Sequence, residues 1–193
     1  MKKSKITFKE KMSWWKGDLF TEDIIELAVT KAYRDLMRTI RGFSANPNHD
    51  IIFTNVKNEL KKSIAIFLNL NIKSQKEFDM RHAILCQKLI IAFDSQLFTV
   101  GQAQKWINMT FKYLHLLEYE KLDKLYEFCH VPVDSYMLKI TNYHMTKPWS
   151  KIDDYKEYLK FQEWFRNKYN NDIPLDAEFY LWLKEAKKSR GNL

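Results

Sequence analysis

Apolar residues recur at helical spacing along almost the whole chain. Between 21 and about 41, one helix face carries the apolar residues Ile25, Val29, Ala32, Leu36 and Ile40. The same periodicity predicts further helices at about 54–69, 75–92, 102–118, 123–128, 134–142, 151–169 and 174–188. We therefore predict an all-α fold, a compact single-domain bundle of seven to eight helices.

Capping residues mark several of these ends. Gly42 fits the C-cap of the first helix, and a loop follows it. Ser74 with Glu77 makes a capping box for the helix at 75–92. Ser150 with Asp153 is the corresponding signal for the helix at 151–169.

Composition excludes several classes of protein. Of the 193 residues 46% are hydrophobic, which excludes a disordered chain. Only four residues are glycine, and neither a GxGxxG nor a Walker A pattern occurs, which argues against nucleotide-binding doubly wound folds. The two cysteines make no disulfide framework, and no apolar run is long enough for a signal peptide or a membrane span. We expect a cytoplasmic protein that makes no membrane contact.

The net charge of +8 is concentrated at the two ends of the chain. Residues 1–16 form a basic N-terminal arm with a net charge of +5, and residues 184–193 form a basic tail with +3. The helical domain between them, 17–183, is neutral. Any electrostatic attraction to nucleic acid would therefore come from the ends and from local patches.

One such patch is predicted on the first helix. Its cations lie at i, i+3, i+7 and i+10, opposite the apolar face: Lys31, Arg34, Arg38 and Arg41. Such a row could contact successive phosphates. The alternative interpretation is an ordinary solvated helix face.

The helix at 102–118 is apolar on two sides. Lys105 and Lys112 lie opposite its main core face, together with Met109. A lysine held there would be partly desolvated, which favours the free amine and makes it a better nucleophile. The alternative is a lysine whose stem covers apolar surface while its amine reaches water.

An extended segment precedes Asp134, because residues before Pro132 avoid the helical region. An aspartate that begins a helix is most often an N-cap. A carboxylate at such a fixed place could also face a positively charged, sugar-like transition state or orient water.

A metal site is a further possibility with little support in the spacing. The zinc-ligating types present are His82, Cys86, Cys129 and His130. They do not follow CxxC or HExxH spacing, so we expect neither a metal nor another cofactor.

Taken together, these segments resemble the helix–hairpin–helix DNA glycosylase superfamily, and most closely its divergent archaeal 8-oxoguanine glycosylase branch. The resemblance lies in Gly101 and Lys105 at the start of an apolar helix, followed by Val131-Pro132-Val133-Asp134-Ser135. The usual LPGVGxKTA-like hairpin is absent, and only the Val100-Gly101 pair of it remains. The pattern also fits an offshoot that acts on modified DNA, for instance phage DNA in bacterial defence.

The resemblance implies cleavage of the N-glycosidic bond of a damaged or modified base that is flipped out of DNA. Lys105 would attack the sugar C1′ and Asp134 would assist; if Lys105 is not the nucleophile, water serves. Gly101 and Lys112 would contact the DNA backbone. The base would meet a set of polar and aromatic side chains: Gln104, Asn108, Tyr143 and Trp149.

Two other functions remain open at this point. A non-catalytic, helical nucleic-acid-binding module would use the same basic face and ends without a pocket. A helical protein-interaction factor would instead expose an aromatic surface, drawn from Trp14, Trp15, Trp164, Phe165, Tyr180 and Trp182.

Overall fold

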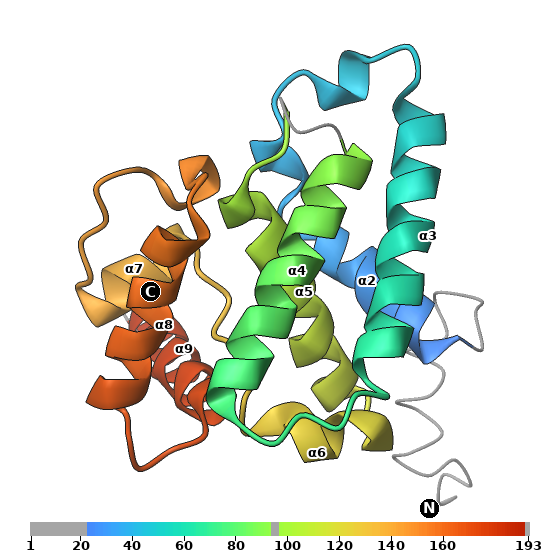
Figure 1. The fold of residues 1–193 in the computed structure, drawn as a ribbon. Coiled ribbons are helices and arrows are strands. Elements are labelled where there is room, and N and C mark those ends of the chain that lie inside the picture. The colour runs from blue at the N-terminus through green and yellow to red at the C-terminus, as the bar shows by residue number, and fades with distance from the viewer. Residues whose placement is uncertain (1–22, 94–96, 192–193) are drawn as a thin grey trace, which may run out of the picture.

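The computed structural model describes residues 23–93 and 97–191, and these fold into eight α-helices without a strand (Figure 1). The helices are α2 (Ile24–Arg34), α3 (His49–Phe67), α4 (Gln75–Phe93), α5 (Val100–Leu116), α6 (Asp123–Tyr126), α7 (Ser135–Thr141), α8 (Tyr155–Lys168) and α9 (Pro174–Gly191). The all-α prediction is confirmed. The predicted basic arm at 1–16 lies outside the described residues.

Helix α5 is the centre of the bundle, with α2, α3 and α4 on one side of it and α7, α8 and α9 on the other (Figure 1). Almost every side chain from Val100 to Leu114 is buried, as the apolar positions on two sides predict. Helix α2 presents the small residues Ala28 and Ala32, which let α2 and α5 approach closely. The indole N–H of Trp106 donates to the carbonyl of Val29 at 2.9 Å, which satisfies the one polar group of that buried ring.

The first helix is shorter than its periodicity predicts. Helix α2 ends at Arg34, and a 3₁₀ turn follows at Met37–Thr39. The side-chain amide of Gln102 donates to the carbonyl of Thr39 at 2.9 Å and draws this turn onto the start of α5. Gly42 then takes a left-handed conformation with φ of 76°. The predicted row of four cations on one helix face is therefore wrong, because the chain leaves the helix after the second of them.

Later boundaries agree with the pattern more closely. Helix α7 follows Asp134 as predicted, while α8 begins at Tyr155, with Asp154 as its N-cap instead of the predicted Ser150 and Asp153. Helix α9 continues to Gly191, so the predicted tail from residue 184 is helical as far as that residue. Within 23–93 and 97–191, no helix combines the length and apolar character that crossing a membrane requires.

Gly101 is required where α5 meets the segment at Trp149–Lys151. A Cβ atom at Gly101 would lie 1.8 Å from the carbonyl oxygen of Trp149. The Gly101 amide donates to the carbonyl of Ile152 at 2.9 Å. Backbone packing within the protein therefore accounts for this glycine, and its amide is already used.

We expect Gly101→Ala to lower the free energy of unfolding by about 2–3 kcal/mol, because the added methyl group overpacks a rigid backbone contact. At an ordinary helical glycine, substitution by alanine would instead raise the free energy of unfolding by about 1 kcal/mol. Urea unfolding measures the difference. Gly42→Ala, which has open space around its Cβ, should cost only about 1 kcal/mol through its backbone conformation. A stabilised Gly101→Ala would contradict this packing.

Candidate active site

Lys105 and Asp134, 29 residues apart, meet in the structure. The Lys105 Nζ lies 2.6 Å from Asp134 Oδ2, while Asp134 Oδ1 accepts the backbone N–H of Met137 at 2.7 Å as the N-cap of α7. The lysine side chain is 6% exposed and the aspartate side chain 29%. The carboxylate is thus fixed at both oxygens and is the member of the pair that solvent reaches.

The position of Asp134 follows from hydrogen bonds between side chains and the backbone of the extended segment before it. Gln104 accepts the Val133 N–H at 3.1 Å through Oε1 and donates to the Val133 carbonyl at 2.9 Å through Nε2. Its side-chain amide therefore satisfies both backbone groups of Val133, as a neighbouring β-strand would. Because Gln104 precedes Lys105 and Val133 precedes Asp134, this pairing places the charged residues face to face.

Gln162, from α8, makes the same pair of hydrogen bonds two residues earlier in the segment, at Val131. It accepts the Val131 N–H at 3.0 Å and donates to the Val131 carbonyl at 2.8 Å. Both glutamines are almost completely buried. We call Gln104 and Gln162, with the backbone of Val131 and Val133 that they pair, the glutamine clamp.

The structure gives Gln104 and Asn108 a role within the framework instead of exposing them to a base. Both are fully buried. The Asn108 Nδ2 donates to Gln104 Oε1 at 3.0 Å and to the Tyr158 hydroxyl at 2.9 Å. Their predicted contacts with substrate would require these bonds to break.

A second ion pair lies two helical turns along α5. The Lys112 Nζ is 2.5 Å from Glu178 Oε2 of α9, and it also stands 4.3 Å from the centre of the Phe179 ring. Burial raises the pKa of Glu178, and Lys112 opposes that shift only in part; the charges of Lys105 and Asp134 also act on this carboxyl. Lys112, predicted to contact DNA, is therefore buried in an ion pair, and Glu178 is a site residue that the sequence did not indicate.

Two aromatic residues follow Asp134 and Glu178 in the sequence and pack on each other. Tyr136 follows Asp134 by two residues, and its ring centre is 5.9 Å from that of Trp182. Trp182 stands one turn beyond Glu178 on α9 and remains 46% exposed. Trp182 is one of the aromatics predicted for a partner surface, while the sequence gives no sign of its contact with Tyr136.

The aromatics predicted to meet a base lie elsewhere. Tyr143 packs on Phe161 and Trp164, with ring centres 5.0 and 4.7 Å away. It lines a hollow of about 330 Å³ whose lining includes neither Lys105 nor Asp134. Trp149 is half-buried against the core, and its carbonyl faces Gly101.

The predicted DNA-contacting cations are spread around one end of the bundle. Lys31 and Arg34 belong to the last turn of α2, while Arg38 and Arg41 lie in and after the 3₁₀ turn. The three arginines are exposed. The bond from Gln102 to Thr39 brings this turn to the N-terminal end of α5, one turn from Lys105.

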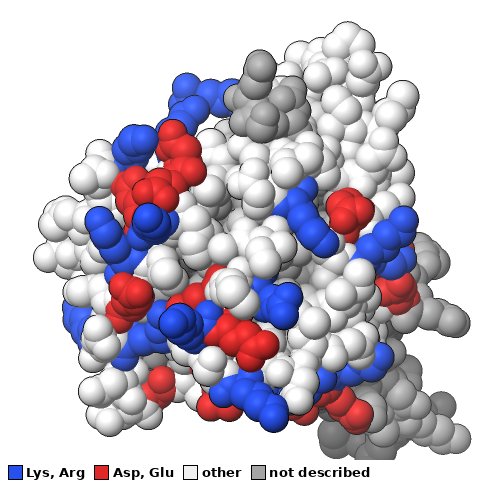
Figure 2. All heavy atoms as spheres, in the orientation of Figure 1, with Lys and Arg blue, Asp and Glu red and all other residues white. Residues whose placement is uncertain are grey.

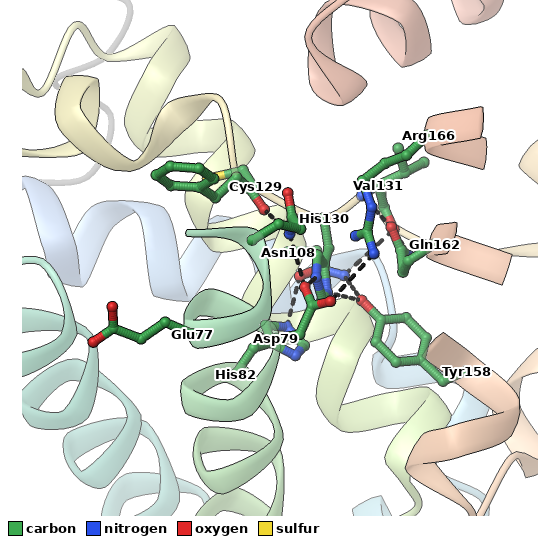
Figure 3. A network of polar contacts seen from close by, with 12 residues as sticks. Glu77, Asp79, His82, Asn108, Cys129, His130, Val131, Tyr158, Gln162 and Arg166 are labelled. Atoms are coloured by element: carbon green, nitrogen blue, oxygen red, sulfur yellow. Dashed lines mark hydrogen bonds and ion pairs between the residues drawn. The ribbon is translucent and has the colours of Figure 1, made fainter. Parts of the chain in front are cut away.

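A buried polar network supports the clamp from behind (Figure 3). The His130 Nε2 donates to Asp79 Oδ1 at 2.7 Å, and its Nδ1 accepts from the Tyr158 hydroxyl at 2.8 Å. Arg166 donates to the other Asp79 oxygen at 3.2 Å. The Tyr158 hydroxyl also accepts a hydrogen bond from Asn108 Nδ2, so a chain of hydrogen bonds connects Asp79 to the clamp.

Both ring nitrogens of His82 have hydrogen-bond partners. Nε2 lies 2.9 Å from Asn108 Oδ1, and Nδ1 lies 2.9 Å from the Tyr155 hydroxyl, which donates to the Asp79 carbonyl at 3.0 Å. Burial lowers the pKa of His82 well below its usual value, and the nearby His130 adds to the effect. Burial lowers the pKa of His130 too, although Asp79 opposes this. Both imidazoles are therefore neutral at pH 7.

The histidines and cysteines considered for zinc are occupied by these bonds. All four imidazole nitrogens of His82 and His130 have partners, and the Cys129 thiol donates to the carbonyl of Leu125 at 3.5 Å. Among the described residues, no group of three or more histidine, cysteine or acidic side chains could hold a metal ion.

Comparison with protein-family models, curated proteins and solved structures gives no match to this chain.

We expect Gln104→Leu to lower the free energy of unfolding by about 3–5 kcal/mol, because it leaves several buried polar groups unpaired, including both backbone groups of Val133. Gln87→Leu, at an exposed position on α4, is the matched control and should change it by less than about 0.5 kcal/mol. Equal effects of the two substitutions in urea unfolding would contradict the role of the clamp.

The two neutral histidines make stability depend on pH. Since the pKa of each is lower in the folded than in the unfolded chain, unfolding takes up protons below about pH 6.5. Each histidine that takes up a proton on unfolding lowers the free energy of unfolding by at most about 1.4 kcal/mol per pH unit. For the two histidines together we expect a fall of about 2 kcal/mol between pH 7.5 and 5.5. His82→Gln should reduce this slope by about half. A free energy of unfolding that stays constant over that range would show that the histidines are not held neutral.

Proposed function

We propose that the protein cleaves the N-glycosidic bond of a damaged or modified base in DNA. The observation that carries the proposal is the contact of 2.6 Å between Lys105 and Asp134. A lysine in the second turn of a helix and an aspartate at the N-cap of a later one are the two residues that the resemblance to helix–hairpin–helix glycosylases requires.

Asp134 supplies the electrostatic part of the reaction. Departure of the base leaves positive charge on the sugar, and a carboxylate held beside it stabilises that charge. The N-cap bond to Met137 and the clamp at Val133 hold the Asp134 carboxylate in one orientation. Such a carboxylate needs no reorganisation during the reaction, which is what makes electrostatic stabilisation effective.

Lys105 supplies the nucleophile once DNA separates it from Asp134 and its ammonium group loses a proton. The amine lone pair forms the bond to C1′, the electron pair of the glycosidic bond leaves with the base, and the proton that Lys105 gave up passes through solvent to neutralise that base. Opening of the sugar ring then gives a Schiff base, which water hydrolyses. If Lys105 only holds Asp134 in place, water attacks C1′ instead and the product is a plain abasic site.

The surroundings supply groups that suit a displaced base. Tyr136 and Trp182, close in sequence to Asp134 and Glu178, offer aromatic surface, and aromatic rings stack on bases of any sequence. Glu178 adds a carboxyl group whose pKa is raised by burial. Arg38, in the turn that Gln102 holds at the start of α5, is exposed and would contact phosphates in this proposal.

The test is base release from oligonucleotides that each carry one modified base, in single- and double-stranded form, followed by alkaline cleavage at abasic sites. Wild-type protein should release at least one of these bases. Lys105→Gln and Asp134→Asn should each lower the rate by about a hundredfold or more. Asparagine keeps the N-cap acceptor, so Asp134→Asn should remain folded. Borohydride trapping in the same assay distinguishes attack by Lys105 from attack by water.

Lys61→Gln is the matched control, because Lys61 also pairs with carboxylates, Asp23 and Glu26, on α2. It should retain full activity and trapping. Full activity of both site variants would overturn the proposal. Salt-dependent DNA binding without release of any base would show the non-catalytic alternative.

A further inference from the structure

The outer face of the α3–α4 pair carries an apolar groove, far around the bundle from α7 and α9 (Figure 1). Two hollows lie along it. The first is lined by Ser63, Ile66, Phe67, Leu70, Arg81, Ile84, Leu85 and Lys88, and the second by Asn55, Glu59, Lys88, Ile91 and Ala92. Lys88 borders both hollows, so they adjoin, and we call the two together the α3–α4 groove.

The rim of this groove is apolar and exposed. Ile66 is 63% exposed, Ile84 47% and Ile91 67%. Ile84 and Ile91 are seven residues apart and so lie on the same face of α4. Figure 2 turns this side of the molecule toward the viewer: few charged groups lie over the upper parts of α3 and α4, and both signs of charge lie farther down. A single exposed isoleucine is ordinary, but three at adjoining hollows indicate an interaction site.

The charges at the groove indicate what it binds. Arg81 and Lys88 are exposed, and neither forms an ion pair within the described residues. Lys57 and Lys61 of α3, by contrast, are already paired with Glu26 of α2. Glu59 also lines the second hollow, where it accepts the Ser63 hydroxyl at 3.1 Å. The lining thus carries two cations against one acid, and an acidic partner would meet both cations beside the apolar surface.

We propose that the α3–α4 groove binds a short amphipathic helix of a partner protein, with apolar side chains in the groove and acidic side chains against Arg81 and Lys88. From Asn55 to Ile66 the groove follows α3 for about 17 Å, which is the length of about three helical turns. A helix with apolar residues at i, i+4, i+7 and i+11 matches that span. This inference does not depend on the proposed glycosylase activity.

The probe is a fluorescein-labelled helical peptide of about fourteen residues, with leucines at that spacing and glutamates beside them. Its partner peptide carries lysines in place of the glutamates. In fluorescence anisotropy with the full chain, we expect the acidic peptide to bind at least about tenfold more tightly than the basic one. The double variant Arg81→Glu, Lys88→Glu should reverse this preference.

The control makes the same charge change elsewhere, in Lys121→Glu with Lys124→Glu, and should leave the preference unchanged because both lysines are exposed near α6. Equal binding of the two peptides, no binding of either, or an unreversed preference in the double variant would overturn the proposal. A concentration-dependent dimer that Ile84→Glu abolishes, without peptide binding, would assign the groove to a second copy of this chain. Duplex DNA binding that the double variant removes would overturn it in favour of phosphate contacts.

Discussion

The arrangement of this protein depends on how one buried, extended segment satisfies its backbone. In the part of the chain that the structure describes, no strand lies beside Val131 and Val133, and unpaired N–H and C=O groups at such depth would each cost about 1–3 kcal/mol. Side-chain amides of Gln104 and Gln162 take the place of a strand. The clamp thereby joins α5 and α8 to the segment that ends at Asp134, and it fixes where that carboxylate meets Lys105.

The groups behind the clamp explain why it is rigid. Asn108 connects Gln104 to Tyr158, and through His130 to Asp79, so each amide has a single hydrogen-bonding arrangement. Such a network contributes modestly to net stability, but it disfavours other packings because any shift leaves a buried group unpaired.

The two lysine–carboxylate pairs likewise contribute little net stability and disfavour other packings. Removal of water offsets much of their attraction, while loss of one partner would leave a buried charge.

The sequence predicted the helices well where one apolar face continues, and poorly where a tertiary contact intervenes. Helix α2 ends at Arg34 because Gln102, distant along the chain, holds the turn at Thr39. The resemblance to helix–hairpin–helix glycosylases, and not the spacing alone, implies that Lys105 and Asp134 meet. Glu178 could not be found that way, since its partner Lys112 is 66 residues away and no local pattern links them. The prediction that Gln104 contacts a base differs from the structure because a sequence does not show which backbone groups a buried amide will pair.

Amide hydrogen exchange of Val131 and Val133, followed by NMR on the full chain, tests the central claim most directly. Both amides lie outside any helix or strand, and their hydrogen bonds are the ones that the clamp supplies. The account predicts exchange as slow as that of the buried amides in the middle of α5. Exchange at the rate of an exposed loop would show that the glutamines do not hold this segment, and that Asp134 is not fixed against Lys105.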